Sequence, residues 1–199
     1  MISVLILAGG KSSRMGFDKA LIKIDRQYLL TKTYQIATEL SNQVFIITSS
    51  EHPYQSILPN TTQFIIEPYP YQGPFVAFCH GLSFIKTEWV LLLPCDLIYL
   101  HSQEIKSWLK RLSSLSPETI ALLPSHEKGW ECLCGFYRRG CLLSLQKSIN
   151  QGNKSFQRWL KQEKVSPLMV KDKRVLYNCN TPDDLAKWAE DSSFGNGLG

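Results

Sequence analysis

The residues best suited to chemistry stand in one short segment near the start of the chain. Residues 7–19 read Leu-Ala-Gly-Gly-Lys-Ser-Ser-Arg-Met-Gly-Phe-Asp-Lys. Gly9 and Gly10 lack a Cβ, so their backbone amides can come close to an anion. Arg14 and Lys19 add positive charge to the same segment. These residue types together indicate a loop that binds a polyanion such as a triphosphate.

The spacing of this loop excludes two common phosphate-binding motifs. A Walker loop needs four residues between its first glycine and a Gly-Lys pair, and that spacing is absent here. The dinucleotide-binding fingerprint G-x-G-x-x-G is absent too. Residue types alone leave open the alternative that this is a glycine-rich loop without a function.

A second candidate is a single carboxylate that follows an apolar run. Residues 89–93 are continuously apolar, and Pro94 and Cys95 separate them from Asp96. Open α/β sheets bind ligands at the carboxyl ends of their strands, so we expect Asp96 beside the glycine loop. A carboxylate there can hold Mg²⁺ against phosphate oxygens. The alternative is that Asp96 is an ordinary turn or cap residue.

Strand and helix patterns alternate in the first half of the chain and would position these residues. Short apolar runs bounded by turn residues predict strands at 4–7, 44–48, 64–66 and 89–93. Apolar positions at helical spacing predict helices over 28–41 and 74–86, the latter opened by a proline, with a short helix near 52–58. This alternation predicts a three-layer α/β/α domain with a mainly parallel central sheet.

The second half of the chain has a less regular pattern. Helices are predicted at 102–112, 139–149, 154–163 and from Thr181 to about 190, and strands at 119–123, 131–137 and 175–177. We expect one domain over residues 1–190 and a flexible C-terminal tail over 191–199, which is polar and glycine-rich.

Composition limits the possible environments and partners. The net charge of +5 suits an anionic small molecule, and no Lys/Arg run or basic helix predicts nucleic-acid binding. Six cysteines lack zinc-type spacing, and Cys132 and Cys134 fit alternate positions of a strand, which favours buried thiols in a reducing compartment. No signal peptide and no apolar stretch long enough for a membrane helix is found, so we expect a cytoplasmic protein without a membrane partner.

The full string from Leu7 to Lys19 resembles the signature of the molybdenum cofactor guanylyltransferases, or molybdopterin-guanine dinucleotide synthases, which looks like L-A-G-G-x-S-x-R-M-G-x-D-K. Three further stretches extend the resemblance over essentially the whole chain: 73–74 (Gly-Pro), 93–96 (Leu-Pro-Cys-Asp) and 178–185, which is similar to N-x-N-T-P-x-x-L. The resemblance implies a Rossmann-like nucleotidyltransferase fold. It also implies transfer of GMP from GTP to a molybdopterin-type cofactor, with release of pyrophosphate.

The resemblance assigns roles to particular residues. It implies catalytic roles for Arg14, Lys19 and Asp96, with Asp96 also binding Mg²⁺ as the cofactor. The nucleotide-binding set is Leu7, Ala8, Gly9, Gly10, Lys19 and Asp96, and the expected substrate-binding set is Glu67, Gly73, Asn178 and Asn180. Pro68 stands where many members have an aspartate, and Ala77 stands where they have a glycine. The implied pathway would bring transient contacts with other cofactor-biosynthesis proteins or with recipient apoenzymes.

Two other functions stay open at this point. The loop does not settle the base, so a cytidylyltransferase acting on molybdopterin or on another phosphorylated metabolite is the first alternative. The second is a noncatalytic nucleotide-binding protein. The presence of Arg14, Lys19 and Asp96 together argues against it, because binding alone would not require all three.

Overall fold

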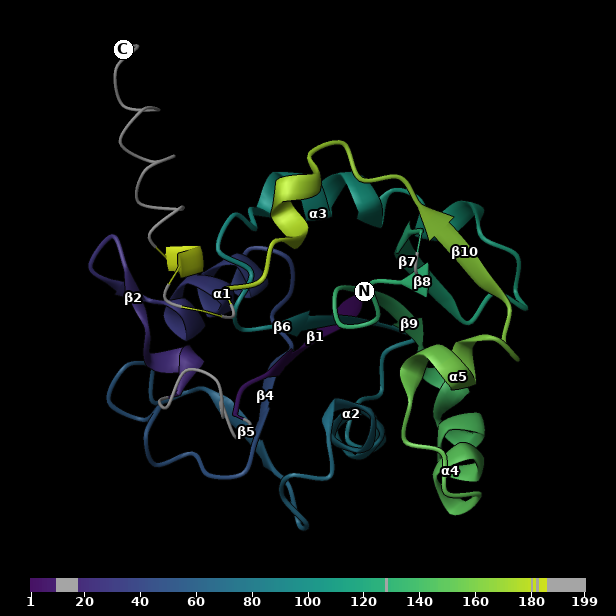
Figure 1. The fold of residues 1–199 in the computed structure, drawn as a ribbon, viewed down its shortest axis with the longest axis horizontal. Helices are drawn as coiled ribbons and strands as arrows, with labels where there is room; N and C mark the ends of the chain where they lie inside the picture. The colour runs from purple at the N-terminus through teal and green to yellow at the C-terminus, as the bar shows by residue number, and fades with distance from the viewer. Residues whose placement is uncertain (10–17, 128, 180, 182, 186–199) are drawn as a thin grey trace.

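The computed structural model describes residues 1–9, 18–127, 129–179, 181 and 183–185. One sheet crosses the molecule, and helices cover both of its faces (Figure 1). The strands of this sheet are β1 (Ile2–Leu7), β4 (Val44–Thr48), β5 (Gln63–Ile66), β6 (Trp89–Pro94), β7 (Ala121–His126), β8 (Gly129–Trp130), β9 (Gly135–Arg138) and β10 (Val165–Leu168). Their order is β10-β7-β9-β6-β1-β4-β5, and β8 pairs with β7.

Strand direction brings most carboxyl ends to one rim of the sheet. β1 runs parallel to β4 and β6, and β4 runs parallel to β5. β9 lies antiparallel between β6 and β7, and two antiparallel steps restore the direction, so β7 and β10 run the same way as β6. The mainly parallel three-layer fold predicted from the sequence is confirmed.

Both faces of the sheet are covered, which explains the uninterrupted apolar runs of its central strands. Val4 and Ile6 of β1 face the side of α1 (Leu29–Thr38) and α3 (Ser102–Leu109). Leu5 faces the side of α2 (Pro74–Ser83), α4 (Leu142–Asn150) and α5 (Phe156–Leu160). Helix α2 packs closely on β1 because Gly81 has no side chain. A Cβ at that position would lie 2.7 Å from Leu5 Cδ2.

Three sequence-based predictions of local structure were wrong. Only Gly135–Arg138 of the predicted 131–137 strand is extended, because residues 132–134 turn between β8 and β9. Residues 175–177 fall in and just after a 3₁₀ helix, η4 (Lys173–Leu176), which the Asp172 side chain caps. The segment near 52–58 is a series of turns rather than a helix, as the proline at position 53 favours.

Several elements were not predicted. A small hairpin pairs β2 (Lys23–Ile24) with β3 (Gln27–Tyr28), and its turn residues Asp25 and Arg26 have φ angles of 50° and 64°. Two-residue hairpin turns require positive φ, and the sequence carried no glycine to announce one. Short 3₁₀ turns also went unpredicted at η1 (Lys19–Leu21) and η2 (Leu112–Ser114), whereas η3 (Arg139–Cys141) forms the first turn of the helix predicted at 139–149.

All six cysteines are free and buried. Burial raises the pKa of the Cys79 thiol to about 11 and, with a contribution from Glu131, that of Cys132 to about 12. Cys132 and Cys134 lie in the turn before β9, so their expected alternation on a strand was wrong although their burial is observed. Among the described residues, no helix has the length and apolar character needed to cross a membrane. The predicted tail at 191–199 lies outside the described residues.

Candidate active site

The register of β1 and β6 sets the geometry of the candidate site. Leu7 and Pro94 are paired residues on these parallel strands, so Gly9 and Asp96 each lie two positions past the pair, at the same rim. Across this rim the Lys19 ammonium contacts the Asp96 carboxylate, with Nζ 3.0 Å from Oδ2. Both side chains are largely shielded, at 21% and 14% exposed. The structure therefore brings together two of the three residues expected to be catalytic.

Lys19 is held in place by the residue before it. Asp18 caps the 3₁₀ helix η1, because its Oδ1 accepts a hydrogen bond from the Ala20 amide at 3.0 Å. Its other oxygen, Oδ2, accepts a hydrogen bond from the Tyr54 hydroxyl at 2.6 Å. Burial and the neighbouring Asp18 carboxylate raise the pKa of the Tyr54 hydroxyl well above its usual range. Tyr54 lies in the irregular segment after β4 and carries no signal in the sequence that marks it as a site residue.

The end of β1 leaves room only for a glycine at position 9. Gly9 has a φ of 105°, a conformation that residues with a side chain rarely adopt. An added Cβ would lie 3.2 Å from Thr48 Oγ1 and 3.8 Å from the Tyr54 hydroxyl. Tyr54 is therefore close to Gly9 and to Asp18, the described residues on either side of the segment 10–17. That segment, with Gly10 and Arg14 in it, lies outside the described residues.

A pocket of about 270 Å³ opens beside Gly9, and it is called here the β1/β4 pocket. It is lined by Leu7, Ala8, Gly9, Ile47, Ser49, Glu67, Tyr71, Gly73, Pro74 and Ala77. Five of the residues expected to bind nucleotide or substrate thus share one cavity: Leu7, Ala8, Gly9, Glu67 and Gly73. Helix α2 begins at this pocket, and the amino end of a helix favours an anionic group. Burial raises the pKa of the Glu67 carboxyl.

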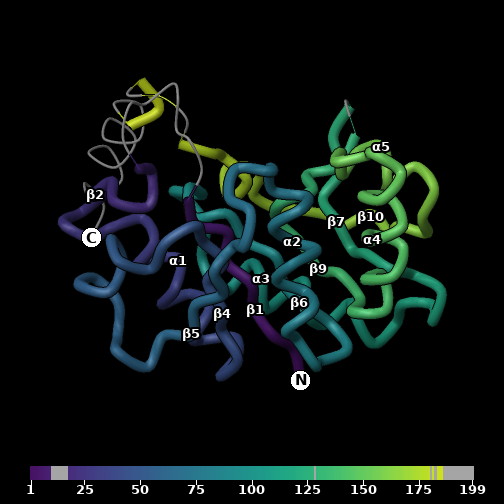
Figure 2. Tube along the Cα trace, turned by 90° about the horizontal axis from the view of Figure 1, so that it is seen from below, coloured from purple at the N-terminus to yellow at the C-terminus, as the bar shows by residue number. Residues whose placement is uncertain are grey.

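Asn178 reaches the site by backbone pairing rather than through the β1/β4 pocket. It forms an isolated antiparallel bridge with Leu97, and the Cys179 amide donates to the Asp96 carbonyl at 2.8 Å. Figure 2 shows this late segment of the chain crossing the end of the sheet opposite the N-terminus. Asn178 therefore lies beside Asp96 although some eighty residues separate them in the chain, whereas Asn180 lies outside the described residues.

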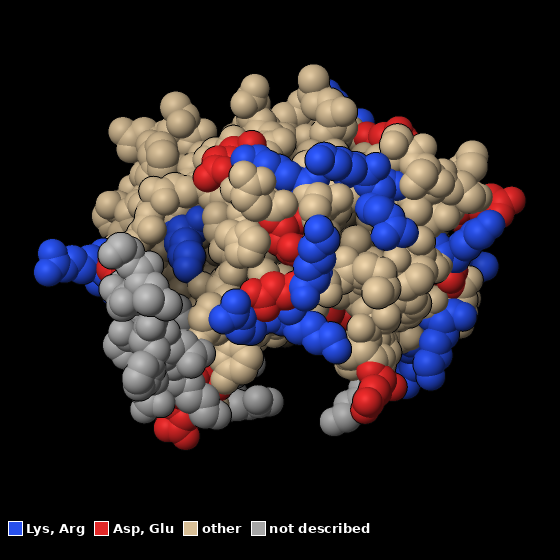
Figure 3. Space-filling view, turned by 90° about the horizontal axis from the view of Figure 1, so that it is seen from above, with Lys and Arg blue, Asp and Glu red and all other residues tan. Residues whose placement is uncertain are grey.

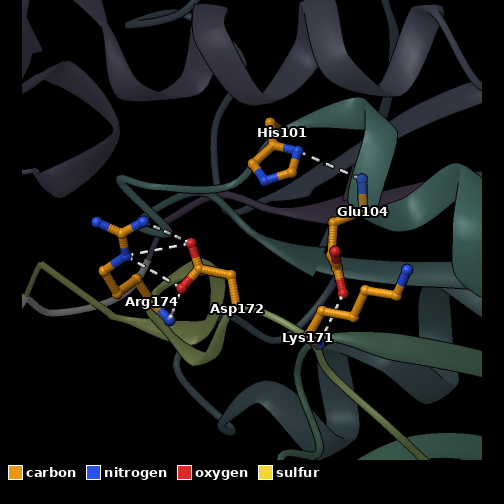
Figure 4. Close-up of polar contacts among 5 residues, drawn as sticks. All are labelled: His101, Glu104, Lys171, Asp172 and Arg174. Atoms are coloured by element: carbon orange, nitrogen blue, oxygen red, sulfur yellow. Dashed lines mark hydrogen bonds and ion pairs between the residues drawn. The ribbon is translucent and has the colours of Figure 1, made fainter.

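A buried carboxylate holds the start of this late segment. Glu104 of α3 accepts a hydrogen bond at Oε1 from the Lys171 amide at 3.1 Å (Figure 4). The same oxygen accepts one from the Trp108 indole at 3.0 Å. The neighbouring Asp172 pairs with Arg174 through two guanidinium nitrogens. Glu104 could not be singled out from its sequence position, because a glutamate in the first turn of a helix usually faces solvent.

The environment of Asp96 concentrates charge. Its Oδ1 atom is buried and has no hydrogen-bond partner among the described residues. Burial raises the pKa of the adjacent Cys95 thiol, the Asp96 and Asp18 carboxylates raise it further, and Lys19 opposes them. Cys95 is thus an uncharged thiol packed among two carboxylates and one cation. Within the described part of the chain, no cluster of three or more metal-binding side chains occurs.

A second, larger pocket of about 590 Å³ lies at the carboxyl ends of β7 and β10, and it is called here the β7/β10 pocket. It is lined by Pro124, Ser125, His126, Glu127, Glu131, Leu168, Met169, Val170, Lys173 and Leu176. None of the residues that line the β7/β10 pocket was singled out from the sequence as a site residue.

Lys and Arg side chains gather at the centre of the face that Figure 3 shows, among acidic ones.

The sequence model of the MobA-like NTP transferase domain matches residues 4–166. The chain belongs to this family. The match begins within β1, includes Lys19, the β1/β4 pocket and Asp96, and ends within β10.

Relatives and solved structures agree with this family. The chain is 45% identical over 185 residues to a probable molybdenum cofactor guanylyltransferase of Nostoc sp., covering 93% of this chain and 89% of the relative. It is 39% identical to the protein of the same description from Synechococcus elongatus, covering 92% of this chain and 95% of that one. The crystal structure of molybdopterin-guanine dinucleotide biosynthesis protein A from Archaeoglobus fulgidus superposes with a TM-score of 0.79 at 21% identity, covering 98% of this chain and 100% of that one. The family and the nucleotidyltransferase fold expected from the sequence are confirmed.

Proposed function

We propose that this protein transfers GMP from GTP to a molybdopterin-type cofactor, forming molybdopterin guanine dinucleotide and releasing pyrophosphate. The family membership and the guanylyltransferase relatives support this reaction. The observation that carries the assignment to residues is the contact of Lys19 with Asp96 at the rim where β1 and β6 end. The six buried, free thiols support a reducing compartment, and we assign the protein to the cytoplasm.

The reaction needs positioning and charge neutralisation rather than a covalent intermediate. A phosphate oxygen of the acceptor attacks the α-phosphorus of GTP, and the bond from that phosphorus to the bridging oxygen of pyrophosphate breaks. Backbone amides near Gly9 and the Lys19 ammonium can stabilise the negative charge that spreads over the phosphate oxygens. Asp18 and Tyr54 orient Lys19 toward this charge. Arg14 and Gly10 belong to the same proposed phosphate-binding loop.

Asp96 fits the binding of Mg²⁺. Its buried Oδ1 without a described partner is the kind of atom that a bound cation would satisfy. Magnesium is usually held by one or two carboxylates together with substrate phosphates, so a site without a cluster of protein ligands is compatible with it. When bound, Mg²⁺ supplies neutralising charge to the triphosphate. We propose Asp96 as its protein ligand.

The proposed substrate contacts follow from the β1/β4 pocket and from the segment that carries Asn178. We propose that the nucleotide occupies the β1/β4 pocket, in contact with the backbone of Leu7, Ala8 and Gly9 and near Glu67 and Gly73. Asn178 would then face the acceptor, because it pairs with Leu97 beside Asp96. Asn180, outside the described residues, belongs to the same proposed substrate-binding set.

The assignment is tested with the purified variants Lys19→Ala and Asp96→Ala. Each should lose most of the pyrophosphate release that depends on GTP and molybdopterin while it keeps its circular-dichroism spectrum. A matched control is Lys106→Ala, which breaks an ion pair of similar length, 3.1 Å from Lys106 Nζ to Glu39 Oε2, at an exposed position away from the rim. Turnover near that of the wild type in either rim variant would refute the proposed roles.

The base preference is tested separately with a thermal-shift panel of GTP, CTP, ATP and UTP with Mg²⁺. A ligand that binds only the folded state raises the apparent stability, by about 2.7 kcal/mol at a concentration one hundred times its Kd. We expect the largest shift with GTP. A larger shift with CTP would replace the guanylyl assignment with a cytidylyl one.

A further inference from the structure

We propose that the β7/β10 pocket binds the pterin ring of the acceptor and that Glu131 recognises the edge of the ring that carries the 2-amino group. This inference rests on the proposed function, because it names the part of the acceptor that this end of the rim selects. Glu131 would be a specificity-determining residue, distinct from Lys19 and Asp96, which act on the phosphates.

The size and position of the pocket suit a bicyclic ring. Its volume of about 590 Å³ is roughly twice that of the β1/β4 pocket, at about 270 Å³. It opens where β7 and β10 end, which is the same rim that carries Asp96. A ligand in this pocket can therefore extend a phosphate along the rim toward the proposed nucleotide site.

The walls of the pocket combine five apolar residues with five polar or charged ones, so they offer both an apolar surface for a flat ring and hydrogen-bonding groups for its polar edge. Pro124 and Leu168 form part of one wall where β7 and β10 pair, and they are partners in the strand register. Met169 lines the pocket while 77% exposed, so a planar ring could cover it. Lys173 adds a cation at the same pocket, which suits an acceptor that carries a phosphate.

Glu131 lines this pocket directly after β8. Its backbone amide donates to the Pro124 carbonyl at 2.9 Å, which fixes the start of its side chain at the pocket wall. Burial raises the pKa of the Glu131 carboxyl, His126 and the Leu133 amide lower it, and the Asp96 carboxylate raises it. Asp96 is thus close enough to Glu131 for their charges to interact.

Hydrogen-bond chemistry explains why a carboxylate suits a pterin. The pyrimidine edge of a 2-amino-4-oxopteridine presents two adjacent donors, the ring N3–H and the 2-amino N–H. A carboxylate has two oxygens and only acceptor capacity, so it can accept both. A 2,4-dioxopteridine (lumazine) presents a carbonyl in place of the amino group, and this carbonyl would face the carboxylate oxygen without a hydrogen atom between them.

The substitution Glu131→Gln should therefore change which ring, pterin or lumazine, the pocket prefers. The test measures binding of pterin and of lumazine by their fluorescence, with and without a nonhydrolysable GTP analogue and Mg²⁺. The wild type should bind pterin more tightly, by about tenfold or more, since a site built for a hydrogen bond rejects an analogue that lacks it. Glu131→Gln offers one donor and one acceptor, so this variant should prefer lumazine.

The matched control is Glu127→Gln, which changes the same residue type at the exposed edge of the same pocket. It should keep the preference of the wild type for pterin. The same samples are assayed for GTP binding by thermal shift, which Glu131→Gln should leave within twofold of the wild type.

The possible outcomes separate this inference from the proposed function. GTP binding without any preference of the wild type for pterin, or a preference that Glu131→Gln leaves unchanged, would overturn the inference and leave the GMP-transfer assignment intact. A preference for pterin that reverses in Glu131→Gln supports the inference even if no GMP transfer is detected. The absence of GMP transfer would count against the proposed function alone. Failure of the wild type to bind either ring would also overturn the inference.

Discussion

The two ends of the strand rim are built in different ways. At the β1/β4 end, Gly9 and Asp96 follow two adjacent parallel strands, and their relative position is set by the strand register. At the β7/β10 end, the pocket is formed by a hairpin, a turn and a crossing segment that is held through Glu104 and through pairing with Leu97. One end is therefore positioned by the sheet itself, and the other by contacts that side chains and loops make above it.

This difference suggests a division of labour. Phosphoryl chemistry tolerates little misplacement of charge, so its residues follow the most rigid part of the fold. Recognition of the acceptor can rest on segments that vary from protein to protein without disturbing the sheet. Side-chain variants at the first end that leave the backbone unstrained should then change catalysis with little effect on stability. Variants at the second end that remove a buried contact should change stability or acceptor binding.

The largest expected effect is that of Asp96→Asn. The amide oxygen can still accept a hydrogen bond from Lys19, but the negative charge proposed to hold Mg²⁺ is lost, so kcat should fall at least about a hundredfold. The free energy of unfolding should change little, because the loss of the ion pair with Lys19 offsets the relief of a buried carboxylate oxygen that has no described partner. Activity assays and urea denaturation of the same preparation measure both. Loss of activity accompanied by marked destabilisation would show that Asp96 also supports the fold, which would contradict the proposed difference between the two ends of the rim.

Glu104→Ala tests the other end of the rim. It removes the acceptor of two donors, the buried Trp108 indole and the partly buried Lys171 amide, and should cost about 2–3 kcal/mol of unfolding free energy. Glu104→Gln keeps an Oε1 that can accept both hydrogen bonds and should cost much less. We expect the KM for molybdopterin to rise in Glu104→Ala, with little change in the KM for GTP. Equal changes in both constants would show that the two ends are not independent.

Gly9→Ala measures how tightly the end of β1 is specified. A residue with a side chain is strained at a φ of 105°, and the added Cβ would contact the Thr48 hydroxyl, so we expect destabilisation by about 1–2 kcal/mol. Weaker GTP binding should accompany it. Gly140→Ala is the control, since no atom lies within 4 Å of a Cβ built there. Similar midpoints of denaturation for the two variants would contradict the strain argument.

The smallest expected effect is that of Arg174→Ala. Its ion pair with Asp172 is well formed but exposed, and exposed pairs contribute little to stability. The denaturation midpoint should match that of the wild type. The Asp172 cap on the Arg174 amide remains in this variant, because that hydrogen bond uses the backbone. A clear loss of stability would mean that the crossing segment depends on the ion pair more than on Glu104.

The first half of the fold could be predicted closely because its strands are buried on both faces. Val44–Thr48 was predicted to the residue, and the glycine loop marked the carboxyl end of β1. The second half was harder for a physical reason. Strand β9 is short, and the turn before it continues the same apolar pattern, so periodicity could not separate Cys132 and Cys134 from the strand that follows.

The candidate site divides in the same way. Lys19, Asp96 and the residues of the β1/β4 pocket carry signals in the sequence, because their types and spacing are unusual. Tyr54 and Glu131 carry none. Tyr54 becomes notable only when folding places its hydroxyl against Asp18, and Glu131 only when folding places it in the wall of the β7/β10 pocket. These placements depend on the tertiary fold, and the residues next to Tyr54 or Glu131 in the sequence do not indicate them.

The reactivity of the buried cysteines can report local or global unfolding of the protein. A thiolate is the form that reacts with disulfide reagents, and both burial and the raised pKa values of these thiols keep that form rare in the native state. Labelling of the folded protein must then wait for a transient local or global unfolding event. The order in which individual cysteines become modified, read by mass spectrometry, would rank the layers of the domain by how readily each one comes apart.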